Sequence, residues 1–363
     1  MLRQPPAADI VDCDVHPNTE RGLQCVYPYM TPAWRERFHR KGAHRISAAP
    51  TVRYTHPNGS IQREDARPEG GRPAGSDPRL VINELITEHC IAVAILNSLQ
   101  ASVLSSALAN TAESIPLVSA FNDYLIDKWL TCDQRFRLAA TVAVQDPSAA
   151  VEEISRIGNH PQVAAIAVPL ADCLLGNRRL WPIYQEAEKH SLPILIHGSG
   201  AEGVFQGAPS FAGGVADSYV ERFLSMTPLA ESNLTSLVFS GTLERFPRLK
   251  FVFAEFGFTW LVPLLWRMER MWRNLRHEVP WVKRSPIEYV HGQCRFTTQP
   301  LDEPEQPAHL DLMIGLLGED HLCFSSDYPH WDNEMPGQVL GRLSADARAK
   351  IFGGNARRTF RLS

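Results

Sequence analysis

Four short apolar runs in this chain each end in a side chain that can bind a metal ion. The runs lie at residues 10–16, 193–197, 251–255 and 322–327, and they end in His16, His197, Glu255 and Asp327. Continuous hydrophobic runs are typical of parallel strands that are buried on both faces. When such strands close into a barrel, their carboxyl ends meet at one rim, where functional side chains gather. The layout therefore predicts a metal centre at the rim of a parallel β structure.

The spacing of these side chains fits a barrel of eight strands. His16 and His197 are 181 residues apart, and Glu255 and Asp327 are 72 residues apart. A barrel of eight strand-plus-helix units uses roughly 30 residues for each unit. On that scale, 72 residues cover two units and 181 cover four units with a large insertion. We therefore place the four side chains on strands 1, 5, 6 and 8.

Apolar runs and helical patterns alternate along the whole chain. Candidate strands occupy residues 10–16, 91–96, 136–144, 163–168, 193–197, 249–255, 294–297 and 322–325. Candidate helices occupy residues 79–88, 118–130, 149–157, 180–190, 258–275 and 305–317. This alternation favours parallel strands covered by helices. The expected fold class is α/β, a distorted TIM (β/α)8 barrel with long insertions after strands 1 and 5.

Three segments exceed a minimal barrel. Residues 27–78 form an insertion whose second half is rich in Gly, Pro and charge, so we expect a lid or an oligomer arm there. Residues 198–235 leave strand 5 directly over the expected metal. Residues 271–289 carry two tryptophans and are expected to pack against a partner chain. The last segment, 351–360, is expected to form a short helix begun by an asparagine cap, Asn355.

Composition excludes several classes of function. The chain has 363 residues with 44% hydrophobic content, which suits a single domain over residues 1–363. Its 36 basic and 40 acidic residues give a formal charge of -4 without long runs of either sign, so we expect no nucleic-acid or membrane partner. No apolar stretch approaches the roughly 18 residues of a membrane span, and the first residues lack a signal-peptide core. We expect a cytoplasmic enzyme with a small-molecule substrate. The seven cysteines form no Cys-x-x-Cys pair, and most lie in apolar runs, which predicts buried thiols.

Three of the candidate ligands come from the first and fifth candidate strands. Asp14 and His16 are two residues apart, so their side chains point to the same face of the first strand. His197 ends the fifth strand, just before a glycine-serine loop, and imidazole is a common ligand of zinc, iron and manganese. We predict that all three bind the metal. The alternatives are a hydrogen-bonded polar pair at a strand end and a structural histidine.

Asp327 follows the last candidate strand and precedes Pro329, His330 and Trp331, which are expected to form a rigid aromatic rim. Strand 8 lies beside strand 1 in a closed barrel, so Asp327 is expected to bind or face the metal and to accept a proton from its water. The alternative is a helix cap.

Glu255 leaves two interpretations open. The helix expected after it carries Arg267 and Arg270, either of which could form a salt bridge with its carboxylate. In the functional interpretation, Glu255 contacts the metal directly or through water.

At this point the sequence resembles the amidohydrolase superfamily, specifically the amidohydrolase-2 group, which includes aminocarboxymuconate-semialdehyde decarboxylase and related aromatic-acid decarboxylases. The matching stretches are residues 11–16, 192–197, 246–255, 325–330 and 353–356. The resemblance implies a distorted TIM barrel that holds one divalent metal, often zinc or manganese. By the same likeness, the ligands are Asp14, His16, His197 and Asp327.

The chain departs from the pattern of this group at three places. Asp14 stands where the family usually has His or Glu, which keeps two ligands on strand 1 but makes the site more anionic. Glu255 replaces the strand 6 histidine, and a carboxylate cannot donate a proton as imidazole does unless its pKa is raised. Strand 4, at residues 163–169, contains no lysine to be carbamylated, which argues against a bridged dizinc centre. The extra carboxylates together with His330 leave room for a second metal, as in the few relatives with dinuclear non-heme centres.

The leading hypothesis is a metal-dependent enzyme that acts on a small carboxylate or aromatic acid by hydrolysis or by non-oxidative decarboxylation. Asp327 would shuttle the proton, while Glu255 and His330 would orient the reactants. Zinc is the favoured single metal, with manganese or iron as alternatives. Two rival hypotheses remain, a dinuclear iron or manganese oxygenase and a non-catalytic metal-binding subunit of a hetero-oligomer. The resemblance favours a homodimer or an assembly with a related chain.

Overall fold

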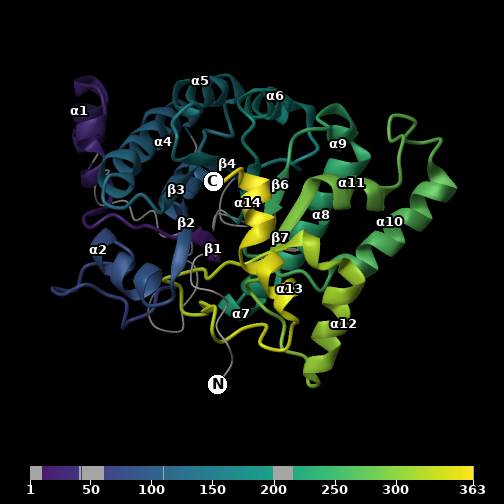
Figure 1. Ribbon diagram of the computed structural model, residues 1–363. Helices are drawn as coiled ribbons and strands as arrows, with labels where there is room; N and C mark the ends of the chain where they lie inside the picture. The colour runs from purple at the N-terminus through teal and green to yellow at the C-terminus, as the bar shows by residue number, and fades with distance from the viewer. Residues whose placement is uncertain (1–9, 41, 43–60, 109, 199–215, 363) are drawn as a thin grey trace.

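The computed structural model describes residues 10–40, 42, 61–108, 110–198 and 216–362 (Figure 1). Eight parallel strands form one sheet in sequence order. The strands are β1 Ile10–Val15, β2 Ile91–Asn97, β3 Phe136–Thr141, β4 Val163–Pro169, β5 Ile194–His197, β6 Phe251–Phe253, β7 Cys294–Thr297 and β8 Leu322–Cys323. The predicted α/β fold class, a TIM barrel, is confirmed.

Hydrogen bonds between the first and last strands close the barrel. Cys13 N donates to Phe324 O at 3.0 Å, and His16 N donates to Tyr328 O at 2.8 Å. Val15 and Tyr328 also form a parallel bridge. The carboxyl end of β1 is therefore joined to the chain that follows β8, which brings two of the predicted site segments together.

Helices alternate with the strands and surround the barrel (Figure 1). The helices are α1 Pro32–Arg40, α2 Pro78–Val81, α3 Leu99–Ala107, α4 Thr111–Leu125, α5 Pro147–Ile157, α6 Trp181–His190, α7 Tyr219–Leu224, α8 Met226–Phe239, α9 Thr242–Arg245, α10 Leu261–Leu275, α11 Pro286–Gln293, α12 Pro307–Leu317, α13 Ala345–Ala349 and α14 Asn355–Phe360. Short 3-10 or π turns lie at Gly22–Cys25, Tyr27–Tyr29, Ile82–Thr87, Ile126–Leu130, Arg178–Leu180, Glu319–His321 and Lys350–Gly354. Within the described ranges, no helix is both long and apolar enough to cross a membrane.

Helix α5 illustrates how the sequence specifies these elements. Asp146 accepts a hydrogen bond from Ala149 N and caps the helix, and Pro147 occupies the first turn, where its missing N–H costs nothing. Ile154 and Ile157 lie on the buried side, which packs the helix against the barrel.

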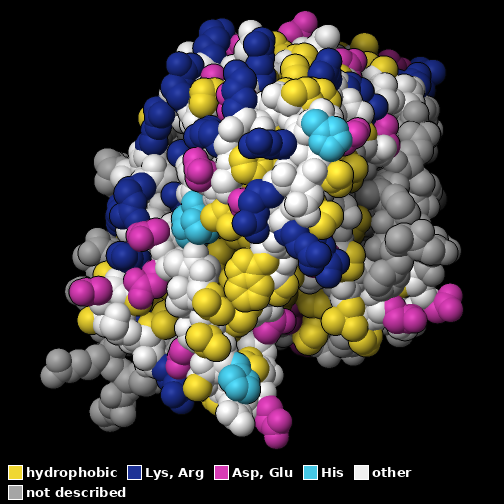
Figure 2. All heavy atoms as spheres, turned by 90° about the vertical axis from the view of Figure 1, so that its right-hand side faces the viewer, with side chains coloured by type: hydrophobic (Ala, Val, Ile, Leu, Met, Phe, Trp, Pro, Cys, Tyr) yellow, Lys and Arg dark blue, Asp and Glu magenta, His cyan; other side chains and the backbone are white. Residues whose placement is uncertain are grey.

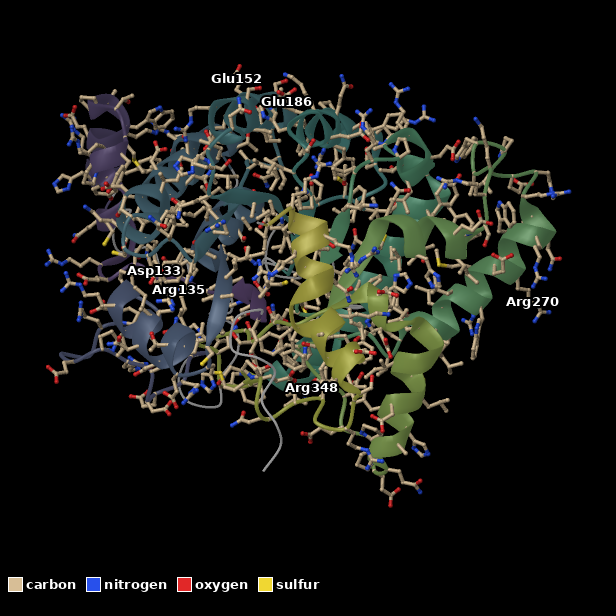
Figure 3. All side chains as sticks on the ribbon, viewed as in Figure 1. Asp133, Arg135, Glu152, Glu186, Arg270 and Arg348 are labelled. Carbon is tan, nitrogen blue, oxygen red and sulfur yellow. The ribbon has the colours of Figure 1, made fainter. Side chains whose placement is uncertain are left out.

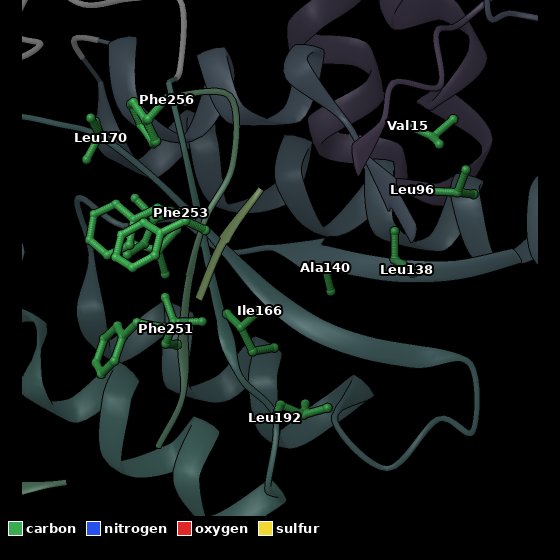
Figure 4. Close-up of a cluster of buried hydrophobic side chains, with 14 of the residues drawn as sticks. Val15, Leu96, Leu138, Ala140, Ile166, Leu170, Leu192, Phe251, Phe253 and Phe256 are labelled. Carbon is green, nitrogen blue, oxygen red and sulfur yellow. The ribbon is translucent and has the colours of Figure 1, made fainter. Parts of the chain in front are cut away.

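Buried apolar side chains form two clusters. The smaller cluster includes Val93, Ile95, Leu195 and Val252 from strands around the barrel, together with Phe360 of α14. Because successive side chains of a strand point to opposite sides, this cluster fills the inside of the barrel. The larger cluster lies between the strands and the helices, and Figure 4 shows part of it, with Phe251 and Phe253 of β6 together with aliphatic side chains such as Ile166 of β4 and Leu138 of β3.

Two sequence expectations change in the structure, and a third cannot be compared with it. The last helix exists, but Asn355 does not cap it, because a continuous helical turn already runs from α13 into α14. Instead, Asn355 Nδ2 donates to Glu319 O at 2.7 Å and Leu322 O at 2.6 Å, which ties the helix to the start of β8. The expectation of buried thiols holds for Cys13, Cys294 and Cys323 only. The predicted insertions at 27–78 and 198–235 lie partly outside the described residues and stay predictions.

Candidate metal centre

All six side chains predicted for the site lie together at the carboxyl ends of the strands. They form two overlapping groups, and within each group the ligand atoms lie within 4.8 Å of one another. The first group contains Asp14, His16 and His197, and the second contains His16, Glu255, Asp327 and His330. All six side chains are buried. The barrel thus brings together residues that are up to 316 positions apart in the chain.

Contacts between histidines and carboxylates connect the cluster. His16 Nε2 lies 2.7 Å from Asp327 Oδ1, and His330 Nδ1 lies at the same distance from that oxygen. His197 Nε2 lies 2.8 Å from Glu255 Oε2 and 3.2 Å from Asp14 Oδ2. Every carboxylate therefore faces at least one imidazole.

The free atoms of the four predicted ligands face the centre of this cluster. Asp14 Oδ2, His16 Nε2, His197 Nε2 and Asp327 Oδ1 are buried and have no hydrogen-bond partner of good geometry. The other ring nitrogens are engaged, since His16 Nδ1 lies 2.8 Å from Asn97 O and His197 Nδ1 lies 2.5 Å from Gly198 O. A ring nitrogen beside a carbonyl oxygen carries a proton, so each Nε2 is the atom that can lose its proton and bind a metal. The donor set therefore fits a divalent metal ion.

The electrostatics of the cluster favour positive charge at its centre. Burial lowers the pKa of His16, but Asp14 and Asp327 outweigh burial and raise that pKa to about 9. Burial raises the pKa of Asp14, but positive His16 and His197 outweigh it and lower that pKa to about 2. The site thus holds protons on its histidines when nothing else balances the carboxylates. Metal binding replaces such protons with a cation.

Glu255 is also held as a carboxylate. Burial raises its pKa, but His197 and then His330 outweigh this effect and lower the pKa to about 2. The alternative of a salt bridge along the following helix is wrong, because the carboxylate turns to His197 while Arg267 and Arg270 are exposed on α10. Figure 3 shows Arg270 on the outside of the barrel.

Local backbone irregularities set the orientation of three of these carboxylates. Between Asp12 and Val15, β1 advances three residues while β2 advances two, from Ala94 to Leu96, so a β-bulge lies beside Asp14. Glu255 and Asp327 adopt φ of 64° and 60°, in the left-handed region that side chains rarely occupy. Such conformations cost about 1–3 kcal/mol each and persist where the surrounding structure fixes them. Their presence at two site residues is typical of a functional centre.

Three contributing residues were missed by the sequence analysis. Asn97, at the end of β2, donates Nδ2 to Asp14 Oδ1 at 3.0 Å. Gln299, beyond β7, donates Nε2 to Asp327 Oδ2 and Asp332 Oδ2, both at 3.1 Å. Burial, followed by the charges of Asp327 and Glu255, raises the pKa of Asp332 to about 8, so this carboxyl keeps its proton at neutral pH. Asn97 follows an apolar run, as the predicted metal ligands do. A search for apolar runs that end in an amide side chain, as well as in His, Asp or Glu, would have identified it.

A pocket opens beside the cluster. His197, Glu255 and His330 form one side of it, and the remaining lining residues are Ile61, Leu99, Gly198, Tyr219, Arg222, Phe223, Met226, Trp331 and Asp332. Tyr219, Phe223 and Trp331 form an aromatic wall, with ring centroids 6.0 Å apart from Tyr219 to Phe223 and from Phe223 to Trp331. The pocket therefore combines a metal-binding edge, an aromatic wall and one arginine.

The fold and this cluster define a TIM barrel with a candidate metal site at the carboxyl ends of its strands. The amidohydrolase family profile matches residues 11–362, and the chain belongs to this family. Curated relatives of the chain are named decarboxylases, so the expectation of an enzyme, a metal-dependent hydrolase or carboxy-lyase, is confirmed.

Curated relatives of this chain include two kinds of decarboxylase. Gamma-resorcylate decarboxylase of Rhizobium sp. (strain MTP-10005) is 26% identical over 295 residues, covering 77% of this chain and 86% of that protein. The 2-amino-3-carboxymuconate-6-semialdehyde decarboxylase of Dictyostelium discoideum is 23% identical over 288 residues, covering 77% of this chain and 75% of that protein.

Solved structures share the fold over nearly the whole chain. A 2,6-dihydroxybenzoate decarboxylase complexed with 2,6-dihydroxybenzoate has a TM-score of 0.68 at 20% identity, covering 98% of this chain and 100% of that chain. The 5-carboxyvanillate decarboxylase of Novosphingobium aromaticivorans, solved with manganese and 4-hydroxy-3-methoxy-5-nitrobenzoic acid, has a TM-score of 0.69 at 19% identity. Its alignment covers 98% of this chain and 96% of that chain.

Proposed function

We propose that this protein is a metal-dependent, non-oxidative decarboxylase of an aromatic carboxylic acid. The observation that carries the proposal is the convergence of four buried ligand atoms without a well-formed hydrogen bond, on Asp14, His16, His197 and Asp327, at the rim of the barrel. Relatives of the same family that act on aromatic acids support the choice of reaction.

Asp14, His16, His197 and Asp327 would hold one divalent ion. When bound, such an ion would supply Lewis-acid chemistry to the site. Nitrogen and carboxylate donors accept zinc, manganese or iron. The sequence favoured zinc, and manganese is bound in two decarboxylases with the same fold, which makes manganese the first metal to test beside zinc.

Asp327 and His330 are assigned the movement of the proton. Decarboxylation of an aromatic acid breaks the bond between ring and carboxylate, releases CO2 and places one proton on the ring carbon. Oδ1 of Asp327 lies 2.7 Å from His330 Nδ1, within reach for proton transfer between the two. Glu255 stays charged and cannot donate, so its role is to orient His197, 2.8 Å away.

The pocket fits a flat anionic substrate. Tyr219, Phe223 and Trp331 offer ring faces and edges for stacking, and the buried cation of Arg222 favours a negative group nearby. These features support an aromatic acid over an aliphatic amide as the substrate.

The test is direct. Protein loaded with manganese or zinc is incubated with 2,6-dihydroxybenzoate and 5-carboxyvanillate, and CO2 release is measured in D2O. We expect CO2 release and one deuterium on the ring carbon of the product. Full metal occupancy without CO2 release from a broader panel of aromatic acids, or hydrolysis of amides instead, would contradict the proposal.

Self-association is part of the same proposal. Exposed apolar side chains gather on the face that carries α10 and α12 (Figure 2), among them Trp266, Met271, Leu275, Leu312 and Leu316. Large exposed apolar patches often mark protein interfaces. Light scattering on the purified protein should give the mass of a dimer, and a monomer at all concentrations would contradict this expectation.

A further inference from the structure

Asp12 is buried between the end of β1, which carries Asp14 and His16, and the segment after β8, which carries Asp327 and His330. Its exposed fraction is 0%. Asp12 Oδ1 accepts a hydrogen bond from Ser326 N at 2.9 Å and another from Asp14 N at 3.3 Å. Burying a carboxyl group is costly unless its hydrogen bonds are satisfied, so its place in the barrel calls for a specific role.

The hydrogen bond from Asp14 N to Asp12 stabilises the bulge of β1. A bulge leaves its extra residue out of the ladder of hydrogen bonds, and the unpaired amide needs another acceptor. Asp14 N finds that acceptor in the carboxyl group two residues earlier. The bulge turns Asp14 so that its carboxylate reaches His197. Asp12 therefore holds the conformation that presents one of the proposed ligands.

The hydrogen bond from Ser326 N to Asp12 fixes the chain just before Asp327. Ser326 N donates to Asp12, and Ser326 Oγ accepts from Tyr328 N at 3.1 Å. Asp327 N donates to Asp14 O at 3.1 Å. Asp327 itself is held at φ 60° between these anchored neighbours. Hydrogen bonds on both sides of Asp327 thus hold its left-handed conformation, and one of them is accepted by Asp12.

We propose that Asp12 is a positioning residue for the metal centre, and the proposal rests on the metal site of the proposed function. One acceptor oxygen sets the orientation of Asp14 through the bulge and of Asp327 through Ser326. Acceptance of hydrogen bonds is what this role requires, so an amide oxygen can replace the carboxyl oxygen. An apolar side chain cannot.

The test measures metal binding rather than turnover. Metal-free protein is titrated with Mn²⁺ against a fluorescent chelator for wild type, Asp12→Ala and Asp12→Asn. Loss of a supporting hydrogen bond behind metal ligands lowers affinity about 10–100-fold, which is the expectation for Asp12→Ala. Asp12→Asn keeps an acceptor and should bind as wild type does. The EPR spectrum of bound Mn²⁺ should change for Asp12→Ala and stay unchanged for Asp12→Asn.

Ser105→Ala is the matched control. Ser105 Oγ is also buried, donates to Val142 O at 2.5 Å and accepts from Val144 N at 3.2 Å, so its loss removes a similar pair of bonds. It joins α3 to the chain after β3 and should change the melting temperature without changing Mn²⁺ affinity. If Asp12→Ala does not fold, Asp12→Leu fills the same space without an acceptor and serves in its place.

The outcomes separate this proposal from the proposed function. Wild-type affinity in Asp12→Ala, or an Asp12→Asn variant as weak as Asp12→Ala, overturns the positioning role and leaves the metal site intact. A wild-type protein that binds neither Mn²⁺ nor Zn²⁺ overturns both.

Discussion

His16 Nε2, at the carboxyl end of β1, lies 2.7 Å from Asp327 Oδ1, beyond the last strand of the barrel. The first and last strands therefore contribute to one contact. His330 Nδ1 reaches the same oxygen, so this carboxylate joins a proposed metal ligand to a group that can carry a proton.

Replacing Asp327 should remove turnover while leaving the fold in place. Asp327→Asn keeps the shape of the side chain but cannot accept and return a proton, so kcat should fall about 100-fold or more. The measurement is kcat on an aromatic acid, with metal content determined in parallel. Asp311→Asn is the control, because Asp311 pairs with Arg342 on the surface and should not affect turnover. An Asp327→Asn variant as active as wild type would end the assignment.

Replacing Asn97 should weaken metal binding. Asn97 Nδ2 donates to the carboxylate of Asp14, so Asn97→Ala frees that ligand and should lower Mn²⁺ affinity about 10–100-fold. Asn122 is a matched control, since its buried amide donates to Thr141 O and Glu153 on the helical side of the barrel. Asn122→Ala should lower the melting temperature and leave Mn²⁺ affinity unchanged. Equal losses of affinity in the two variants would assign Asn97 to general stability.

Glu255 should not set the acid side of the pH profile. Its pKa is lowered to about 2 because His197 and His330 outweigh burial, so it is already charged above about pH 4. Glu255→Gln should lower kcat by loosening His197, yet the acid limb of the kcat/KM profile should keep its midpoint. A limb that disappears in Glu255→Gln would show that this carboxylate titrates in the working range.

Stability should fall below neutral pH through a histidine outside the site. Burial, and then the charges of His291 and Arg295, lower the pKa of His321 from 6.5 to about 4. Because the unfolded chain binds the proton more readily, the contribution of neutral His321 to the free energy of unfolding is complete above pH 6.5. This contribution is lost as the pH falls toward 4. Urea unfolding at several pH values should show a smaller loss for His321→Gln than for wild type. His309→Gln, on the exposed part of α12, should match wild type.

Removing the metal should lower thermal stability. A ligand that binds only the folded state adds about 2.7 kcal/mol when its concentration is 100 times Kd. Chelation should therefore lower the melting temperature, and added manganese or zinc should restore it. Unchanged melting after complete removal of bound ions, checked by elemental analysis, would argue against the proposed ligand set.

The strands were predictable because a parallel strand that is buried on both faces appears in the sequence as a continuous apolar run. Strand β7 was predicted with its observed bounds, Cys294–Thr297, and β1 differs only at its last residue. For β6 the prediction extended to Glu255, but the strand ends at Phe253 because the chain turns into a left-handed conformation at Glu255. The meeting of six polar side chains followed from the same pattern and the order of the strands.

Other features could not be read from the pattern of residue types. The bulge beside Asp14 depends on the register between β1 and β2, and the left-handed φ of Asp327 depends on bonds from β1. Neither Asp14 nor Asp327 is a glycine, the residue type that would have indicated such a conformation in the sequence. Helix α3, Leu99–Ala107, was missed because Ser98 caps a segment without a strong amphipathic pattern.

The hydrogen bonds that close the barrel between β1 and the chain after β8 have a consequence for biosynthesis. The earliest and the latest strands to leave the ribosome carry neighbouring side chains of the proposed site, so a nascent chain that ends before Asp327 lacks one of the four proposed ligands. Metal capture is therefore expected to follow translation, and shortened products released early should emerge without it.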